Sequence, residues 1–515
     1  MSPDSEQQSN KKPFLNGFLD VIERAGNRLP DPVSLFLIFI AITLLLSLVL
    51  SLLGLAVTHP VSSETVSVNN LLTAQYIQRL LVEMPQTFAG FPPLGTVLVA
   101  MLGIGVAEKS GWISALLRQF VAGLHSRALA PAMVFAGIMS SLAADAGYVV
   151  LIPLGALVFA NAGRHPIAGL CATFAGVSAG FSANLVLTSL DPLLAGITQS
   201  AANILDSGYQ VNAAANYFLM IGMVPVLTMA GALVTERVIE PRLGSWASDQ
   251  READSGLSDV ERKALRIANW TALGALVLIA LMAVPENGIL RGVDGDLNPF
   301  YGSLVSLMLL VFLVPGIAYG VVAGSIKSDR DAVGMTADSM SDMGLYIVLA
   351  FVAAHFIALF SWSNLGIIMA ISGAQFLGGI NLGGPLLILI FILLVGLINL
   401  FVGSASAKWA LLGPVFVPML MLLGYSPELS QAAYRVGDSF SNIITPLMPY
   451  FPLILVYGRK YMPEFGVGNL IALMLPYSIA LGIASTTLLV IWMLIGMPLG
   501  PEAGLYFEMP ASAVP

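Results

Sequence analysis

The sequence predicts an all-α integral membrane protein with about nine transmembrane helices and two re-entrant helical hairpins, arranged as inverted repeats. Three observations lead to this prediction: the composition, the recurrence of long apolar runs, and a pattern of prolines and small polar residues that occurs twice. Of the 515 residues, 57% are hydrophobic and only 10% are charged, whereas an ordinary soluble domain has about 25% charged residues. Most of the chain is therefore expected to lie in a lipid bilayer.

Long apolar runs recur along the whole chain. One helix needs about 20 apolar residues to cross the hydrocarbon core of a bilayer. The first run begins near residue 33 behind a polar start, and no small-residue cleavage site closes it, so we interpret it as a first span and not as a signal peptide. The runs expected in the membrane include 33–57, 221–238, 271–284, 304–321 and 467–495.

The distribution of Lys and Arg predicts the orientation, because cytoplasmic loops near membrane ends are enriched in these residues. Basic residues collect before residue 33, in the polar stretch 237–266, and at Arg459 and Lys460, whereas the chain after Pro498 has none. We therefore expect a bacterial inner-membrane protein with a cytoplasmic N-terminus and a periplasmic C-terminus.

The apolar runs and the polar stretches between them divide the chain into seven segments. These are a cytoplasmic N-terminal segment (1–32), N-terminal scaffold helices (33–130), a first hairpin-containing repeat (131–240), a cytoplasmic connector (241–268), scaffold helices of the second half (269–380), a second hairpin-containing repeat with the core site (381–465), and a last transmembrane helix with a periplasmic tail (466–515). In the second half, residues 329–343 alternate charged residues with Met and Val, which predicts an interfacial helix.

Two regions, 131–200 and 392–460, share one pattern of prolines and small polar residues. Each region contains a short turn, Phe-Ser-Ala-Asn at 181–184 in the first and Phe-Ser-Asn at 440–442 in the second. Both contain a pair of prolines 13 residues apart, Pro153 with Pro166 and Pro414 with Pro427.

The repeated pattern predicts irregular backbone at matched places. A bilayer tolerates irregular backbone only where protein or a water-filled cavity covers it. Paired breaks therefore indicate broken helices and hairpins that meet near the membrane midplane, where secondary transporters bind substrates and ions. The alternative for any one of these residues is that Gly and Ser only permit close helix packing.

Arg435 and Asp438 are the strongest candidates for a functional site. A charge inside a membrane span costs about 2.5–3.5 kcal/mol, so such residues are retained for a reason. Three positions apart on a helix, they share one face, and we expect them to neutralise each other. The alternative is a structural ion pair that positions two helices.

Other polar residues near the breaks are weaker candidates. Asp191 precedes Pro192 and can carry a proton, orient a ligand or simply end a helix, and Asp145 lies at the expected tip of the first hairpin. Asn399 can offer its amide oxygen to a ligand. Hydroxyl and amide oxygens at both turns suit a hard cation such as Na⁺, and these residues are Ser182, Asn184, Ser441, Asn442 and Thr445.

Several functional classes are disfavoured. The chain has no basic stripe, which argues against nucleic acid as a partner, and no phosphate-binding loop, which argues against direct use of ATP. Its one cysteine, Cys171, cannot form a disulfide framework or a cysteine metal site. The four histidines form no metal-binding pattern, so an intramembrane enzyme is a remote alternative, and we expect no cofactor. Matched hairpins favour alternating access over a passive channel.

The chain resembles the AbgT family of p-aminobenzoyl-glutamate transporters and antimetabolite exporters. The matching stretches run along nearly the whole chain in family order, and the most specific are "GSASAKWA", "AAYRVGDS" and "NIITPLMPYF". The resemblance implies a homodimer of nine-helix protomers, each with two re-entrant hairpins and a water-filled basin open to the cytoplasm. It also implies a substrate site formed by Asp191, Asn399, Ser406, Trp409, Pro427, Arg435, Asp438 and Pro446.

The function that follows from this resemblance is secondary active transport, driven by a gradient of H⁺ or Na⁺. The expected substrates are aromatic carboxylates such as p-aminobenzoyl-glutamate and other folate catabolites, together with exported sulfonamides. Trp409 would stack on the aromatic ring and Arg435 would pair with the carboxylates. The alternatives are an importer of p-aminobenzoyl-glutamate and a cation-coupled dicarboxylate carrier.

Overall fold

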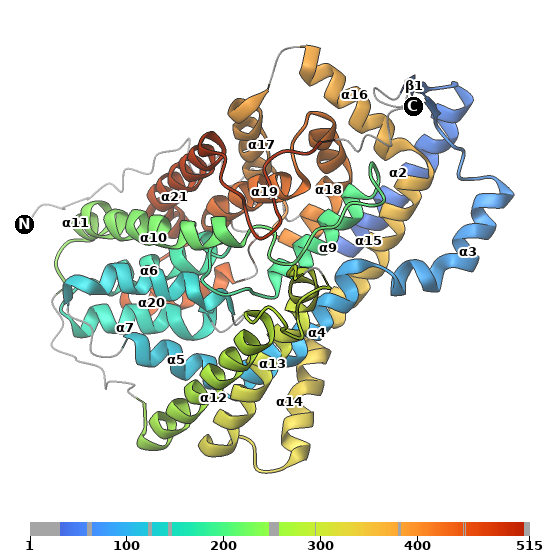
Figure 1. Cartoon of the computed structure of the whole chain (residues 1–515). Helices are drawn as coiled ribbons and strands as arrows, with labels where there is room; N and C mark the ends of the chain where they lie inside the picture. The colour runs from blue at the N-terminus through green and yellow to red at the C-terminus, as the bar shows by residue number, and fades with distance from the viewer. Residues whose placement is uncertain are drawn as a thin grey trace, which may run out of the picture.

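The structure, a computed structural model, is built almost entirely of helices (Figure 1). It describes residues 31–58, 64–121, 126–142, 147–246, 257–293, 295–379, 383–445, 448 and 450–508. Within these ranges the only strands are β1 (Ala56–Thr58) and β2 (Thr65–Ser67), which pair antiparallel. Eight helices there are long and apolar enough to cross a membrane. The prediction of an all-α membrane protein is thus confirmed, and the depth of the hairpins in the bilayer stays a prediction.

The helices fall into two halves. The first half contains α2 (Pro32–Leu52), α3 (Ala74–Ala89), α4 (Pro92–Lys109), α5 (Trp112–Val121), α6 (Leu129–Met139), α7 (Ile152–Asn161), α8 (Pro166–Phe174), α9 (Leu190–Ala202), α10 (Tyr217–Val234) and α11 (Glu240–Leu243). The second half contains α12 (Asp259–Ala283), α13 (Asn298–Ala323), α14 (Asp329–Asp342), α15 (Gly344–Trp362), α16 (Leu365–Gly379), α17 (Gly384–Asn399), α18 (Ala405–Leu422), α19 (Pro427–Ser441), α20 (Phe451–Tyr461) and α21 (Val467–Ile495).

Short 3₁₀ and π turns extend several of these helices. They are the 3₁₀ turns Ser126–Ala128, Ser140–Leu142 and Asn442–Ile444 and the π turns Gly147–Leu151, Ala175–Ala179 and Thr235–Ile239. Such turns mark places where the regular helical hydrogen bonding changes. Four of the six adjoin the irregular segments around α7, α8 and α19, as the paired breaks in the sequence predict.

The two halves share one order of elements. In both, a helix (α6, α17) leads through a break to a hairpin of two helices (α7–α8, α18–α19), followed by a second break, a short helix (α9, α20) and a long helix (α10, α21). The paired prolines fall where this order requires them, because Pro166 and Pro427 are the first residues of α8 and α19.

The two hairpin turns are capped in related ways. Proline suits the first helical position, where its missing N–H would have no partner. The His165 ring accepts a hydrogen bond from Ile167 N at 3.2 Å, and the Ser426 hydroxyl accepts one from Leu429 N at 3.1 Å. A capping side chain followed by proline therefore starts the second arm of each hairpin.

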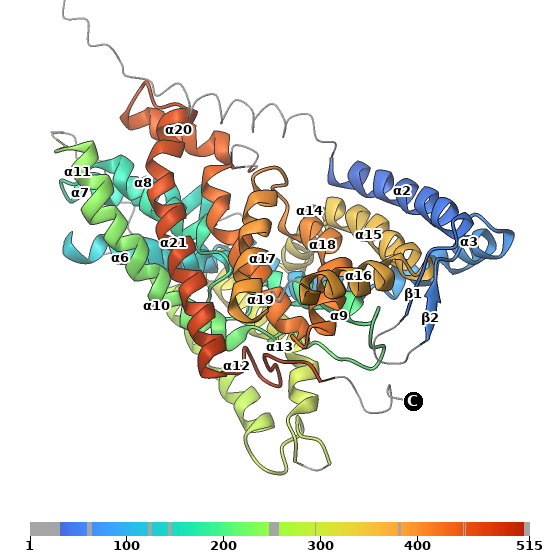
Figure 2. The ribbon, with the colours of Figure 1, turned by 90° about the horizontal axis from the view of Figure 1, so that it is seen from above.

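Helix α19 lies at the centre of the molecule. It packs against α9 from the first half and against α17, α18 and α21 from the second. In both views α17, α18 and α19 lie together, with α21 on one side and α15 and α16 on the other (Figure 1, Figure 2). The π turn 175–179 after α8 also packs against α19, so both hairpins reach the same central region.

The predicted interfacial segment 329–343 forms α14, so its helical nature is confirmed. Asp331 caps this helix: its carboxylate accepts hydrogen bonds from the N–H groups of Lys327 and Ser328, both at 2.8 Å. These hydrogen bonds stabilise the charged form and hold the pKa of Asp331 below its usual range.

Candidate functional site

Helix α19 carries a polar stripe formed by Glu428, Gln431, Arg435 and Asp438. These residues are three, four and three positions apart, so they follow one face of the helix. All four side chains are buried. Burying polar and charged groups is unfavourable unless partners satisfy them. The partners of the polar stripe therefore indicate what the site is arranged to do.

Arg435 pairs with Asp191 and thereby joins the two halves of the chain. Its guanidinium Nη2 donates to Asp191 Oδ1, and both side chains are almost fully buried. The other carboxylate oxygen of Asp191 accepts hydrogen bonds from the Thr188 backbone N at 2.6 Å and from the Thr188 hydroxyl at 3.0 Å. Asp191 lies in the first turn of α9, where the positive end of the helix dipole also favours a carboxylate.

Asp438 pairs with Lys408 of α18. The ammonium donates to Asp438 Oδ1 and also to the amide oxygen of Asn399, at the end of α17. The amide nitrogen of Asn399 donates to the carbonyl oxygen of Asp438 at 2.7 Å. Asn399 therefore binds both members of the ion pair and connects three helices of the second half.

The predicted ion pair between Arg435 and Asp438 is wrong. Successive positions of the polar stripe face different neighbours, since Arg435 reaches α9 while Asp438, one turn further, reaches α18. Side chains three apart on a helix are close, but each of these finds a better-placed partner across a helix interface. Lys408 was not among the predicted residues, although a lysine inside the apolar run of α18 is the signal that could have identified it.

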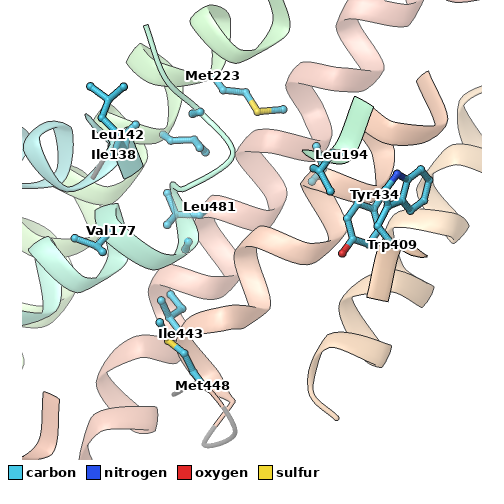
Figure 3. Packing of buried hydrophobic residues seen from close by; sticks show 14 of the residues in the cluster. Ile138, Leu142, Val177, Leu194, Met223, Trp409, Tyr434, Ile443, Met448 and Leu481 are labelled. Carbon is cyan, nitrogen blue, oxygen red and sulfur yellow. The ribbon is translucent and has the colours of Figure 1, made fainter. Parts of the chain in front are cut away.

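An aromatic pair lies beside the two ion pairs. The rings of Trp409 and Tyr434 stack with centroids 4.4 Å apart and planes inclined by 25°. Figure 3 shows the two rings side by side, with Leu194 of α9 facing them. The Trp409 indole N–H donates to the Thr198 hydroxyl at 2.9 Å. That hydroxyl in turn donates to Gln431 of the polar stripe at 2.7 Å.

Both ion pairs retain unsatisfied polar atoms. Among the described residues, Arg435 Nε and Asp438 Oδ2 are buried and have no hydrogen-bond partner. Native structures leave few buried polar atoms without a partner, because an unpaired buried group is energetically costly. The free donor and the free acceptor belong to the two oppositely charged members of the polar stripe.

The oxygens predicted to bind Na⁺ lie in two groups. In the first, Asn184 Nδ2 donates to the Ser141 hydroxyl at 2.9 Å, and the buried Ser182 hydroxyl has no hydrogen-bond partner in the described chain. In the second, Ser441 and Asn442 each accept a hydrogen bond from the Asn399 amide at 2.8 Å. Only the first group therefore retains a buried, unpaired oxygen that a cation could use.

The two groups approach each other through one contact. Asn442 Nδ2 donates to the carbonyl oxygen of Ser178 at 3.3 Å, which joins the second break to the end of the first hairpin. The hydroxyl of Thr445, the last of the predicted cation-binding residues, donates to the carbonyl oxygen of Leu400 at 3.1 Å.

Four further predicted residues border the network or lie outside the described part. Ser406 is half-buried in the first turn of α18, with its hydroxyl 3.4 Å from that of Ser404. Pro427 begins α19, one residue before the polar stripe. Pro446 and Asp145 lie outside the described residues.

A cavity of about 430 Å³ lies between the first hairpin, α5 and α20. Its lining includes Arg118 and Lys460 together with Tyr457 and Tyr461. None of its lining residues belongs to the ion-pair network. Arg118 is paired with Glu261, and apolar residues of the first hairpin complete the lining, so this cavity is a separate and largely apolar hollow beside α7.

Comparison with known proteins agrees with this architecture. The model of the AbgT transporter family matches residues 17–507. The p-aminobenzoyl-glutamate transport protein of Escherichia coli (strain K12) is 36% identical over 509 residues, covering 98% of this chain and 99% of its own.

Two solved structures are similar in fold and in sequence. The YdaH transporter of Alcanivorax borkumensis superposes with a TM-score of 0.88 at 45% identity, over 92% of this chain and 100% of that one. MtrF of Neisseria gonorrhoeae, whose structure illustrates a class of antimetabolite efflux pumps, superposes with a TM-score of 0.89 at 46% identity. The match covers 94% of this chain and 100% of the MtrF chain. These relatives are transporters and not enzymes. The chain therefore belongs to the AbgT family of membrane transporters.

Proposed function

We propose that this protein is a secondary active transporter of p-aminobenzoyl-glutamate and related folate-pathway compounds in the bacterial inner membrane. The observation that carries the proposal is the buried network in which Asp191–Arg435 and Lys408–Asp438 flank the Trp409–Tyr434 stack. The name of the Escherichia coli relative supports this substrate class.

The network offers both groups that an aromatic carboxylate requires. A guanidinium binds carboxylates through directed hydrogen bonds, and Arg435 keeps a buried Nε without a partner in the described chain. A substrate carboxylate would replace Asp191 on Arg435, while Thr188 continues to donate to Asp191. The benzoyl ring would pack on the Trp409–Tyr434 pair.

Charge balance supports coupling to a cation. Lys408 and Arg435 offset Asp191 and Asp438, so the empty network carries no net charge. A bound carboxylate would leave an uncompensated negative charge in a site of low dielectric constant, which is unfavourable. We therefore propose that H⁺ or Na⁺ accompanies the anionic substrate, with Ser182 and Asn184 as the first candidates for a Na⁺ ligand.

Export of sulfonamide antimetabolites is a second candidate function. The similarity to MtrF, at 46% identity over 94% of the chain, favours it. A sulfonamide shares the aminobenzene ring with p-aminobenzoyl-glutamate, so the Trp409–Tyr434 stack would accept either ring. Uptake of p-aminobenzoyl-glutamate and export of a sulfonamide would differ in the direction of net flux under a given gradient.

Transport in proteoliposomes tests the proposal. Labelled p-aminobenzoyl-glutamate and a labelled sulfonamide are supplied under pH and Na⁺ gradients imposed separately in both directions. We expect saturable, gradient-driven accumulation that falls at least about tenfold in Asp191→Asn, equivalent to about 1.4 kcal/mol. Asp259→Asn is the matched control, because the carboxylate of Asp259 is exposed on α12. Flux that is linear in concentration and independent of both gradients would contradict the proposal.

A further inference from the structure

Glu428 differs from the other buried carboxylates. Three carboxylates are buried in the described residues, and two of them, Asp191 and Asp438, pair with cations. Glu428 is only 2% exposed and forms no ion pair within the described chain. A buried carboxylate without a cation favours its neutral, proton-bearing form. Neither the family resemblance nor the relatives' names assign it a role.

The hydrogen bonds of Glu428 connect it to the protein surface. Its Oε2 accepts from the Tyr209 hydroxyl at 2.8 Å, and Tyr209 lies half-exposed in the loop between α9 and α10. The amide nitrogen of Asn216 donates to the carbonyl oxygen of Glu428 at 2.9 Å. The oxygen of the same amide is buried and accepts no hydrogen bond from the described residues. A free acceptor therefore lies on the amide that binds Glu428.

Glu428 also belongs to the polar stripe that contains the proposed substrate site. Gln431, one turn further along α19, accepts from Thr198, and Thr198 accepts from Trp409. Asp191 on α9 and Lys408 on α18 are charged groups on the packed elements, and both are held in ion pairs. The other charged or titratable groups on these elements are Asp206 and Tyr209 in the α9–α10 loop, Tyr477 on α21, and Glu502 and Glu508 in the C-terminal segment. The described helices α17 and α21 offer no charged side chain to α19.

We propose that Glu428 is a proton-binding site coupled to substrate transport. The step is addition of H⁺ to a carboxylate oxygen, which forms one O–H bond and changes the charge from −1 to 0. Loading a proton at Glu428 offsets one negative charge of a carboxylate bound at Arg435, on the same helix face. The coupling part of this inference rests on the proposed transport function, whereas proton binding does not.

Infrared difference spectroscopy tests proton binding without any substrate. Purified protein is titrated with acid and base, and the band of protonated carboxylic acids is followed. We expect one component of this band, which titrates at higher pH than the exposed carboxyl groups, to be lost in Glu428→Gln and kept in Glu464→Gln, where the carboxylate is exposed. Tyr209→Phe removes the hydrogen bond to the charged form and should move the midpoint to higher pH. A band unchanged in Glu428→Gln would overturn the inference.

Transport of labelled p-aminobenzoyl-glutamate then tests coupling. In Glu428→Gln we expect the ratio of accumulation with a pH gradient to accumulation without one to fall to about one, whereas Glu464→Gln, which changes an exposed carboxylate, keeps the parental ratio. Retention of the parental response to the pH gradient would overturn coupling even if the infrared band is lost. If the parental protein moves no substrate, the proposed function and the coupling fail together, and the infrared result alone decides on proton binding.

Discussion

Single residues explain why the network at α19 holds together and why it is sensitive to change. Lys408 and Asp438 are fully buried, and Asn399 binds both of them. Removing one member of a buried ion pair leaves an uncompensated charge, which costs about 3–5 kcal/mol, whereas replacing both by apolar residues is often neutral. The energetic role of the pair can therefore be separated from its role in transport.

Lys408→Met should lower the stability of the protein by about 3–5 kcal/mol, because Asp438 loses its only cation within the described residues. The double variant Lys408→Met with Asp438→Leu should recover most of that stability but not transport. Thermal unfolding in detergent and uptake into proteoliposomes measure the two effects. A double variant that transports at the parental rate would show that the pair is only structural.

At the scale of elements, α19 depends on close packing and on a covered hairpin turn. A Cβ at Gly437 would lie 2.6 Å from the carbonyl oxygen of Ile392 and 2.7 Å from Val395 Cβ, so only glycine lets α19 approach α17 this closely.

At the other end of α19, the C-terminal segment 499–508 covers the turn 423–426. Ser426 N donates to Leu505 O at 3.0 Å, and Phe507 N donates to Gly424 O at 2.9 Å.

Gly437→Ala should destabilise the protein by about 1–3 kcal/mol, since the added methyl group overlaps the backbone of α17. Gly274→Ala is the matched control, because an added Cβ on α12 meets no atom within 4 Å. Alanine there should be neutral or stabilising, given its better helix propensity. Equal unfolding temperatures for the two variants would contradict close packing at Gly437.

Removal of residues 499–515 should uncover the second hairpin turn. Tyr425 is only 7% exposed beneath this segment, so a cysteine in a Tyr425→Cys variant should react slowly with a polar thiol reagent in the full chain and faster in the shortened one. Cys171 is buried and serves as an internal background. Equal labelling rates would show that the segment does not protect the turn.

For the whole molecule, the sequence was sufficient to predict the fold class and the repeated order of elements, whereas the location of the site stays a prediction. Pro166 and Pro427 start the second arm of each hairpin, because proline restricts backbone geometry locally. The pairing of charges was not predicted, because it depends on how α9, α18 and α19 are rotated against one another. Lys408 and Glu428 were not predicted either, although each is a charged residue within a stretch that is buried in the structure. That charge is a signal the sequence contains, so both residues could have been identified without the structure.

The central claim is that the ion pairs and the aromatic stack form the site for an aromatic carboxylate. Equilibrium binding of labelled p-aminobenzoyl-glutamate to purified protein tests it most directly, with Arg435→Met paired to Asp191→Asn so that no buried carboxylate is left charged without a partner. The control is Arg262→Met, which removes an exposed arginine on α12. We predict that the double variant weakens binding at least about tenfold, equivalent to about 1.4 kcal/mol, while the control binds as the parental protein does. Parental affinity in a folded double variant would contradict the claim.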